Sequence, residues 1–438
     1  MTQPFAKHRE SLLTSLAASD AAGVYFSGVE KLRNGDSTFR FRPESDFYYL
    51  TGCREPEACL VLLPHGEKRS VLFLREKDRE QEIWTGRRVG VEAAPATFGV
   101  DLAFAFDELA ERLPRKLVGH SGIEYALGVD GDRDHAMTEC ANKAVRLGRA
   151  GGLVPEHWFH PRTHVHEARL RKSADEIAIM RRAADVSAEA HRAAMAEAEP
   201  GKNEGELDAV LDFTFKRRGG TGSAYTNIVA GGANACILHY VENDRELRAG
   251  ELCLVDAGCE HGYYASDVTR TFPVDGRFTP EQRALYEVVL TAQLSAIDEA
   301  KPGAAFDSVH DVALRRLVEG LVELGLLKGS VDEALEKGTY REFYMHRTSH
   351  WLGLDVHDAG AYAKNGKSRA LEPGMVLTVE PGLYVAPDAD VERCWRGIGI
   401  RIEDDVLVTA TGNDVLSKNA PKSIDDVEDA CRETAAVG

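Results

Sequence analysis

The sequence predicts a two-domain protein of the α/β class. Its 438 residues exceed what one ordinary core accommodates, and about 150 residues per domain favours two domains. Strand-like and helical stretches alternate along the first third of the chain, which is typical of an α/β domain with a mixed sheet. Pro155 and Pro161 then interrupt regular structure. We therefore expect an amino-terminal domain at residues 1–172 and a second domain at residues 173–438.

The first domain is expected to begin with an amphipathic helix at residues 8–19. Short β-prone runs, each closed by glycine or a turn, follow this helix. They lie at residues 23–28, 47–52, 58–63 and 70–74. A helical stretch at residues 102–113 precedes another strand that begins at residues 117–119. This order predicts a sheet with helices packed against it.

The second domain opens with a helix-capping signal. Ser173 stands three residues before Glu176, which is the spacing of a capping box. The apolar residues that follow have helical spacing until Pro200 and Gly201 end the helix. Further helices are predicted at residues 204–218, 280–300 and 306–327. Strands and loops are expected in residues 219–274 and 346–409, and a short surface helix or frayed tail in residues 413–438.

Composition excludes several classes of protein. The formal charge is 53 − 71 = −18, which argues against binding to nucleic acid or to an anionic membrane surface. No run of about 18 apolar residues occurs, and the amino terminus lacks the apolar core of a signal peptide. The eight cysteines form no Cys-x-x-Cys pair. We expect a cytoplasmic location and free thiols.

Asp256 and Asp267 stand at the inner ends of two apolar, β-prone runs, which predicts a β-hairpin. Aspartate is disfavoured in strands, and burying a carboxylate is costly unless a cation or hydrogen bonds meet it. Two such residues facing each other suggest a bound metal. Asp256 as a turn residue and Asp267 as a strand cap explain the pattern equally well without one.

Three later stretches also place polar side chains where apolar ones are expected. Residues 346–358 contain His346, His350 and His357, although a single histidine is more often structural than a ligand. Glu380 ends a strand that Pro381 and Gly382 then break. Period-two alternation puts Arg401 and Glu403 on one strand face between isoleucines.

Together these stretches supply an imidazole and four carboxylates, from Asp256, Asp267, Glu380 and Glu403. This is the ligand count of a two-metal site, in which the ions lie roughly 3.5 to 4 Å apart and acidify a water between them. The mostly oxygen ligand set suits Mn²⁺ and also accepts Co²⁺, Zn²⁺ or Mg²⁺. Arg401 is expected to orient the nearby carboxylate of Glu403.

These motifs resemble the metallopeptidases of the pita-bread fold, family M24, and among them the bacterial Xaa-Pro aminopeptidases (aminopeptidase P). The matching stretches are Asp-Ala-Gly-Cys-Glu, Ser-Asp-Val-Thr-Arg-Thr-Phe, Ser-His-Trp-Leu-Gly-Leu-Asp-Val-His-Asp, Val-Glu-Pro-Gly-Leu-Tyr and Gly-Ile-Gly-Ile-Arg-Ile-Glu-Asp-Asp. The resemblance spans about residues 173–412, and residues 41–52 and 83–88 resemble the family's amino-terminal accessory domain. It implies a pita-bread catalytic domain at residues 173–438.

The resemblance also implies a role for each matching residue. The implied metal ligands are Asp256, Asp267, His350, Glu380 and Glu403. Asp267 and Glu403 would bridge the ions, and Glu380 would also be the general base. His239 and His357 would contact the substrate, and His346 would lie near the site. Trp84 would reach a neighbouring subunit, so we expect a homo-oligomer, either a dimer or a tetramer. Thr269, two residues beyond Asp267 on the same strand face, is by its position a candidate, like Arg401, to support the ligands.

The implied reaction is hydrolysis of Xaa-Pro-Yaa peptides before proline, with Mn²⁺ as the expected metal. Three other functions remain open. An Xaa-Pro dipeptidase would share all five ligands and differ in how much peptide the pocket admits. A methionine aminopeptidase usually lacks a comparable amino-terminal domain of about 170 residues. A non-catalytic pita-bread binding module would lack ligands, whereas all five are present in this sequence.

Overall fold

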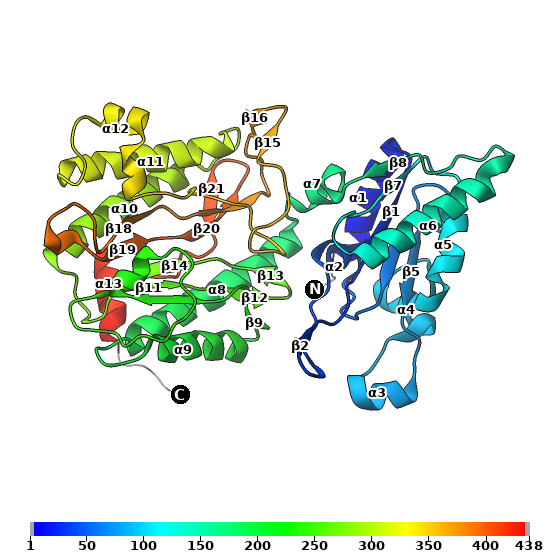
Figure 1. Ribbon diagram of the computed structural model, residues 1–438, viewed down its shortest axis with the longest axis horizontal. Helices are drawn as coiled ribbons and strands as arrows, with labels where there is room; N and C mark the ends of the chain where they lie inside the picture. Colours follow the sequence, from blue (N-terminus) through cyan, green and yellow to red (C-terminus); the bar gives the residue numbers. More distant parts are fainter. Residues whose placement is uncertain (1–3, 434–438) are drawn as a thin grey trace. The chain divides into compact units, whose positions relative to one another are not determined.

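The computed structural model describes residues 4–433 and forms two compact units, divided between Arg169 and Leu170 (Figure 1). The boundary predicted from the sequence lies three residues further along the chain. Both units combine helices and sheets, as expected for the α/β class. No helix among the described residues is long and apolar enough to cross a membrane.

The first unit contains a six-stranded mixed sheet in the order β6-β5-β4-β1-β7-β8. Its strands are β1 (Ala21–Phe26), β4 (Cys59–Leu62), β5 (Ser70–Leu74), β6 (Leu102–Ala105), β7 (Gly122–Glu124) and β8 (His157–Phe159). The pairs β1/β4 and β4/β5 are antiparallel, and the other three are parallel. The helices are α1 (Phe5–Ala18), α2 (Ser45–Thr51), α3 (Arg79–Thr85), α4 (Gly90–Phe98), α5 (Leu109–Leu117), α6 (Gly131–Leu147) and α7 (Val165–Arg169). A small hairpin joins β2 (Leu32–Asn34) to β3 (Ser37–Thr38). The mixed sheet predicted from the sequence is confirmed.

Three predictions for this unit are wrong. Residues 47–52 form the end of helix α2 and not a strand, because the Glu44 side chain caps the N–H groups of Asp46 and Phe47 and Gly52 ends the helix at φ 66°. Residues 102–113 begin as strand β6, which pairs with β5, and become helical only after it, as a 3-10 helix (Phe106–Glu108) followed by α5 from Leu109. The next strand accordingly starts at Gly122 and not at residues 117–119.

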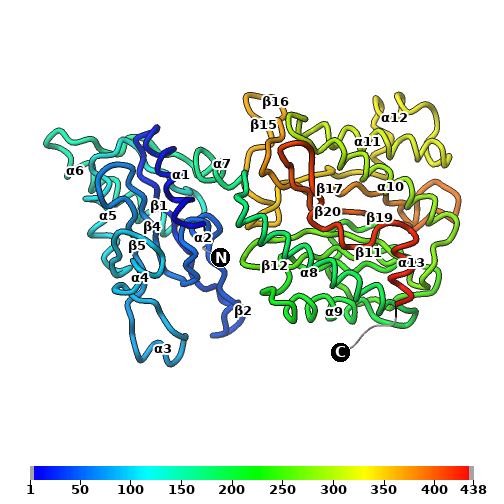
Figure 2. The backbone as a smooth tube through the Cα atoms, turned by 180° about the vertical axis from the view of Figure 1, so that it is seen from behind, coloured from blue at the N-terminus to red at the C-terminus, as the bar shows by residue number. Residues whose placement is uncertain are grey.

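The second unit begins as its capping signal predicts. The Ser173 hydroxyl accepts from the Glu176 N–H, and the Glu176 carboxylate accepts from the Ser173 N–H. The helices are α8 (Ala174–Glu197), α9 (Glu204–Arg217), α10 (Pro280–Glu299), α11 (Phe306–Glu323), α12 (Val331–Lys337) and α13 (Ile424–Arg432). In Figures 1 and 2, α10 and α11 lie on one side of the unit's strands and α8 and α9 on the other. The last residues of the predicted tail, 434–438, lie outside the described part.

Two antiparallel sheets carry most of the chemically interesting side chains. One has the order β10-β11-β14 and the other β17-β20-β21, while β18 pairs with β19. Their bounds are β10 (Ile228–Gly231), β11 (Leu252–Asp256), β14 (Thr269–Pro273), β17 (Val376–Val379), β18 (Gly382–Val385), β19 (Ile398–Arg401), β20 (Asp404–Val408) and β21 (Asn413–Val415). Short strands complete the unit: β9 (Gly222–Ser223), β12 (Cys259–His261), β13 (Tyr264–Ala265), β15 (Ala363–Lys364) and β16 (Lys367–Ser368).

Strands β11 and β14 pair as predicted, but the connection between them is longer than a hairpin turn. Asp256 lies opposite Thr269, and β12 and β13 fill the connection. Gly258 is required there by close packing, since a Cβ would lie 1.7 Å from the Ser266 carbonyl oxygen. Asp256 and Asp267 thus reach the same end of the sheet.

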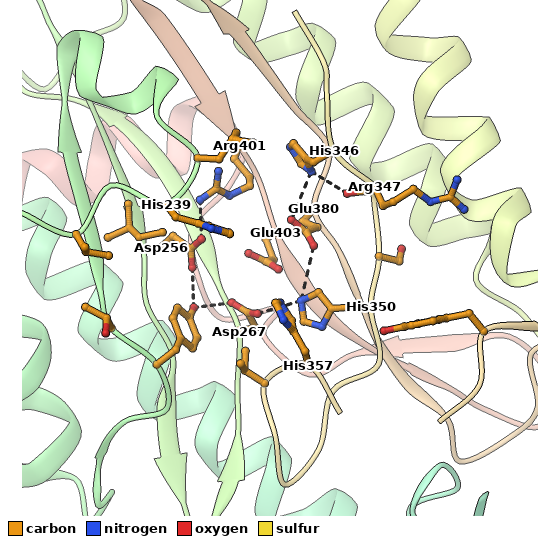
Figure 3. Close-up of a pocket in the computed structure, with 18 of the residues that line it drawn as sticks. His239, Asp256, Asp267, His346, Arg347, His350, His357, Glu380, Arg401 and Glu403 are labelled. Carbon is orange, nitrogen blue, oxygen red and sulfur yellow. Dashed lines mark hydrogen bonds and ion pairs between the residues drawn. The ribbon is translucent and has the colours of Figure 1, made fainter. Parts of the chain in front are cut away.

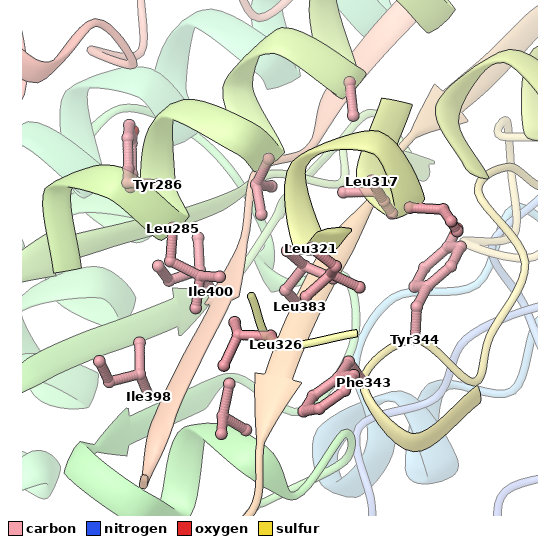
Figure 4. Packing of buried hydrophobic residues seen from close by; sticks show 14 of the residues in the cluster. Leu285, Tyr286, Leu317, Leu321, Leu326, Phe343, Tyr344, Leu383, Ile398 and Ile400 are labelled. Atoms are coloured by element: carbon pink, nitrogen blue, oxygen red, sulfur yellow. The ribbon is translucent and has the colours of Figure 1, made fainter. Parts of the chain in front are cut away.

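A buried hydrophobic cluster fixes the β18/β19 pair beneath α10 and α11. Leu285 of α10 and Leu317 and Leu321 of α11 pack around Leu383 of β18 and Ile400 of β19 (Figure 4). All five side chains are fully buried. Burial of this kind stabilises by about 1.5 to 3 kcal/mol per large aliphatic side chain. The cluster therefore holds the strand that ends in Arg401 and leads to Glu403.

Candidate metal centre

Four carboxylates and several histidines of the second unit line one cavity of about 680 Å³. Asp256, Asp267, Glu380 and Glu403 point toward its centre, as Figure 3 shows. His239, His346, His350 and His357 belong to the same lining. The cavity thus brings together, from separate stretches of sequence, every predicted ligand and every predicted substrate-site histidine.

Backbone hydrogen bonds between distant segments cause this convergence. The Glu380 N–H donates to the Thr348 carbonyl, and the Thr378 N–H donates to the His350 carbonyl, so that His350 lies beside the end of β17. The Glu403 N–H donates to the Thr269 carbonyl across 3.1 Å. This bond places Glu403 next to β14, and therefore next to Asp267.

The distances between the side chains suit a set of metal ligands. His350 Nε2 lies 3.3 Å from Asp267 Oδ2 and 3.7 Å from Glu380 Oε1. Single ligand atoms of Asp267, His350 and Glu403 all lie within 4.8 Å of one another. The buried Oε1 atom of Glu403 has no hydrogen-bond partner among the residues that the structure describes. A buried carboxylate oxygen without a donor fits a cation, so the residues present suit a divalent metal.

Mutual repulsion and burial make the centre electrostatically unfavourable without a cation. Burial, with the charges of Asp267 and Glu380, raises the pKa of Glu403 well above its usual value. Burial also raises the pKa of Asp267 and brings that of Glu380 to about 7. Burial alone would lower the pKa of His350, but Asp267 and Glu380 raise it to about 9. A divalent ion would remove this repulsion.

Arg401 and Thr269 support the carboxylates, with partners that differ partly from those expected. Arg401 Nη2 donates to Asp256 Oδ2 across 2.6 Å. Within the described part of the chain, the Arg401 side chain has no hydrogen bond to Glu403 itself. The Thr269 hydroxyl donates to Glu403 Oε2 across 2.6 Å and accepts from Arg401 Nε. Arg401 reaches Glu403 through Thr269, because the guanidinium extends across the sheet toward β11.

Sequence reasoning missed two tyrosines and an aspartate. The Tyr225 hydroxyl lies 2.7 Å from Asp256 Oδ1 and 2.5 Å from Asp267 Oδ1. The Tyr384 hydroxyl accepts from Arg401 Nη1 at 2.9 Å and bonds His346 Nε2. Asp405 accepts from the Asp267 N–H. Tyr225 lies in irregular chain between β9 and β10, where no sequence periodicity points to it. Asp405, by contrast, lies on the same alternating strand face as Arg401 and Glu403, so the sequence pattern could have found it.

The histidines differ in their surroundings. His346 bonds the Tyr384 hydroxyl and lies 3.8 Å from Glu380 Oε2, and burial lowers its pKa to about 4. The His357 ring lies edge-on to His350 with 4.3 Å between centroids, and burial followed by the charge of His350 lowers its pKa. His239 is exposed on the cavity wall. Trp84 lies in α3 of the first unit, 85% exposed.

Two family models of known proteins match this chain. The sequence model of metallopeptidase family M24 matches residues 178–410, and that of the aminopeptidase P amino-terminal domain matches residues 5–124. The chain belongs to metallopeptidase family M24. Membership implies divalent metal ions and establishes a pita-bread catalytic fold preceded by an α/β domain.

Individual M24 members agree closely with this chain. Xaa-Pro aminopeptidase of Escherichia coli is 45% identical over 97% of both chains. The structure of aminopeptidase PepP from Pseudomonas aeruginosa superposes with a TM-score of 0.94 at 44% identity, covering 98% of this chain and 97% of the other. A zinc-substituted Escherichia coli aminopeptidase P in complex with product gives a TM-score of 0.93 at 44% identity over 98% of both chains.

Proposed function

We propose that this M24 metallopeptidase removes the amino-terminal residue from peptides that have proline in the second position. The observation that carries the proposal is the single cavity lined by all five expected ligands and by His239, His346 and His357. The cavity belongs to a chain that is 45% identical, over 97% of its length, to an Xaa-Pro aminopeptidase. That coverage includes the amino-terminal unit and favours an aminopeptidase of this kind over a methionine aminopeptidase.

The ligand set of this proposal is Asp256, Asp267, His350, Glu380 and Glu403, which would hold two ions, with Mn²⁺ as the expected metal. Asp267 and Glu403, whose ligand atoms lie within 4.8 Å of each other, would be the ligands shared by the two ions. When bound, the two ions would acidify a water molecule and polarise the scissile carbonyl. Tyr225, Thr269 and Arg401 would keep the carboxylates oriented through the hydrogen bonds described above.

Glu380 is the proposed general base. Its Oε1 atom lies 3.7 Å from His350 Nε2, among the proposed ligands, where the carboxylate would be within reach of a proton on metal-held water. The leaving nitrogen of a cleaved Xaa-Pro bond is a secondary amine that must gain a proton, while the intact bond has no N–H to bind. His239 and His357, on the cavity wall, would contact the scissile carbonyl and pass a proton to that nitrogen.

Three further expectations concern the domains, the oligomeric state and the cellular location. Residues 1–172 would form the accessory domain and residues 173–438 the catalytic domain. The exposed side chain of Trp84 would contact a neighbouring copy in a homodimer or homotetramer. Light scattering of Trp84→Ala tests the oligomer, which should dissociate or weaken. A cytoplasmic location stays a prediction from the sequence, and cell fractionation tests it.

The decisive experiment compares Xaa-Pro-Yaa tripeptides with Xaa-Pro dipeptides in the presence of Mn²⁺, with products followed by mass spectrometry. We expect release of the first residue from the tripeptides. Cleavage of the dipeptides alone would replace the proposal by a dipeptidase. Absence of any metal-dependent cleavage would leave a peptide-binding module.

A pair of variants tests the proposed base. Glu380→Ala should fold and lose nearly all turnover, since it loses both a ligand and the base. Glu336→Ala removes an exposed glutamate of α12 and should keep full activity. Substantial turnover by Glu380→Ala would refute the role of Glu380.

A further inference from the structure

Lys172 and Asp358 form a buried ion pair next to the candidate metal centre. Lys172 Nζ lies 3.0 Å from Asp358 Oδ2, and each side chain is 1% exposed. Lys172 belongs to the short segment ahead of α8, and Asp358 directly follows His357. The pair therefore connects the beginning of the second unit to a loop of the cavity 186 residues away in the sequence.

Asp358 organises the loop that carries His357. Its N–H donates to the Trp351 carbonyl across 2.8 Å, and its Oδ1 atom accepts from the Asp355 N–H. The Gly353 N–H donates to the Asp355 carbonyl. The loop, residues 351–358, thus closes on the Asp358 carboxylate, with one oxygen bonded within the loop and the other bonded to Lys172.

Gly353 makes room for this arrangement. A Cβ at Gly353 would lie 2.2 Å from Asp358 Oδ2 and 3.0 Å from Lys172 Cε. Its φ is not in the left-handed region, so the close approach of the ion pair, and not backbone strain, requires glycine. The Trp-Leu-Gly-Leu-Asp-Val-His-Asp stretch therefore contains, besides His357, the parts that seat the Lys172–Asp358 pair.

Lys172 is itself firmly anchored. Its N–H donates to the Gly374 carbonyl across 2.8 Å. A Cβ at Gly374 would lie 3.1 Å from the Lys172 carbonyl oxygen, so the two backbones pass close together. Gly374 lies just before β17, the strand that ends at Glu380. Lys172, the ion-pair partner of Asp358, is thus hydrogen-bonded next to the strand that leads to Glu380, the proposed base.

A buried ion pair adds little net stability, because desolvation of two charges offsets most of their attraction. Its directional contacts nevertheless specify one geometry. We propose that Lys172 and Asp358 are positioning residues that hold His357 in the orientation needed for hydrolysis. The proposal rests on the proposed function, since it assumes that His357 serves the substrate. Misplacement of a catalytic group by about 1 Å can cost on the order of 100-fold in rate.

The first test needs no substrate. Hydrogen–deuterium exchange of the Mn²⁺-loaded full chain is compared between the wild type and Lys172→Met. Exchange in residues 351–358 should rise, while peptides that contain Asp256 or Glu403 should be unchanged and the Mn²⁺ titration midpoint should stay within about twofold. Unchanged exchange in residues 351–358 would overturn the proposal, whatever the enzyme cleaves.

The second test is a double-mutant cycle on an Xaa-Pro-Yaa substrate. Lys172→Met should lower kcat about tenfold or more, with a smaller change in KM. The same substitution in a His357→Ala background should cost almost nothing further, because the residue that it positions is already absent. An equal loss in both backgrounds would mean general destabilisation and would sink the positioning role.

Two further variants keep the tests decisive. Gly353→Ala retains both charges and displaces Asp358 by its methyl group, so it should reproduce both effects even if Lys172→Met does not fold. Lys202→Met breaks a partly exposed ion pair with Glu197 in the same unit and should change neither readout. A Gly353→Ala protein with wild-type exchange and kcat would contradict the proposal.

Discussion

Arg401 donates a hydrogen bond from Nη2 to Oδ2 of Asp256 across 2.6 Å, and both side chains are buried in the candidate metal centre. The same guanidinium reaches the Thr269 hydroxyl through Nε and the Tyr384 hydroxyl through Nη1. One planar group thus fixes three partners on three different strands. Lysine cannot reproduce this fork, because its ammonium acts from one point.

We accordingly expect Arg401→Lys to weaken Mn²⁺ binding to the metal-free protein by about 10- to 100-fold. Isothermal titration calorimetry measures this change directly. Arg181→Lys, at a half-exposed pair with Asp414 in the same unit, serves as the control and should leave the affinity unaltered. Equal affinities for Arg401→Lys and the wild type would remove Arg401 from the metal support.

Thr269→Val should also weaken metal binding, by about tenfold. Valine keeps the shape of threonine but deprives Glu403 Oε2 of its hydroxyl donor, while the side chain stays fully buried. Thr269→Ser retains the donor and should bind nearly as the wild type does. If the serine and valine variants titrate alike, the hydroxyl has no such role.

Metal removal should destabilise the second unit. A ligand that binds only the folded chain stabilises it by about 2.7 kcal/mol at 100 times its Kd, and here it also relieves the repulsion among buried carboxylates. Thermal unfolding with a chelator should therefore occur at a lower Tm than with Mn²⁺, and the Tm should rise with metal concentration. A Tm insensitive to Mn²⁺ would argue against a metal site.

His191 should make the protein sensitive to mild acid. Its ring is fully buried with Nε2 bonded to the Ala257 carbonyl, and burial lowers its pKa to about 4. The unfolded chain, with a histidine pKa near 6.5, binds the proton first as the pH falls. Stability is thus intact above about pH 6.5 and decreases by about 3 kcal/mol on approaching pH 4.

His191→Gln keeps a donor for Ala257 but does not titrate. Chemical unfolding of the two metal-free proteins at several pH values isolates the histidine, since other groups contribute equally to both. The difference in unfolding free energy should change between pH 6.5 and 4 and be constant above that window. A constant difference throughout would contradict the buried neutral ring.

Leu321→Ala should cost about 2 to 5 kcal/mol of unfolding free energy, because Leu321 is fully buried in the cluster between α11 and the β18/β19 pair (Figure 4). Leu294→Ala, at a 45% exposed position of α10, should change stability by less than about 0.5 kcal/mol. Urea unfolding measures both. Similar values for the two variants would mean that the cluster is loosely packed.

Local sequence patterns determined those parts of the fold that neighbouring residues stabilise by themselves. The capping box of Ser173 and Glu176 joins residues three apart, so the start of α8 could be predicted without tertiary information. Residues 47–52 show where this fails. Their three consecutive aromatic residues suit a strand, but the cap from Glu44 and the left-handed Gly52 favour helix α2.

For the metal centre, local patterns reveal which side chains are unusual: carboxylates at the ends of apolar strands, where burial is costly without a cation. Their partners depend on how the folded chain packs. Tyr225 meets Asp267, Arg401 meets Asp256 and Lys172 meets Asp358 across separations of 42, 145 and 186 residues. Such contacts depend on how strands and loops pack together, and no local spacing encodes them.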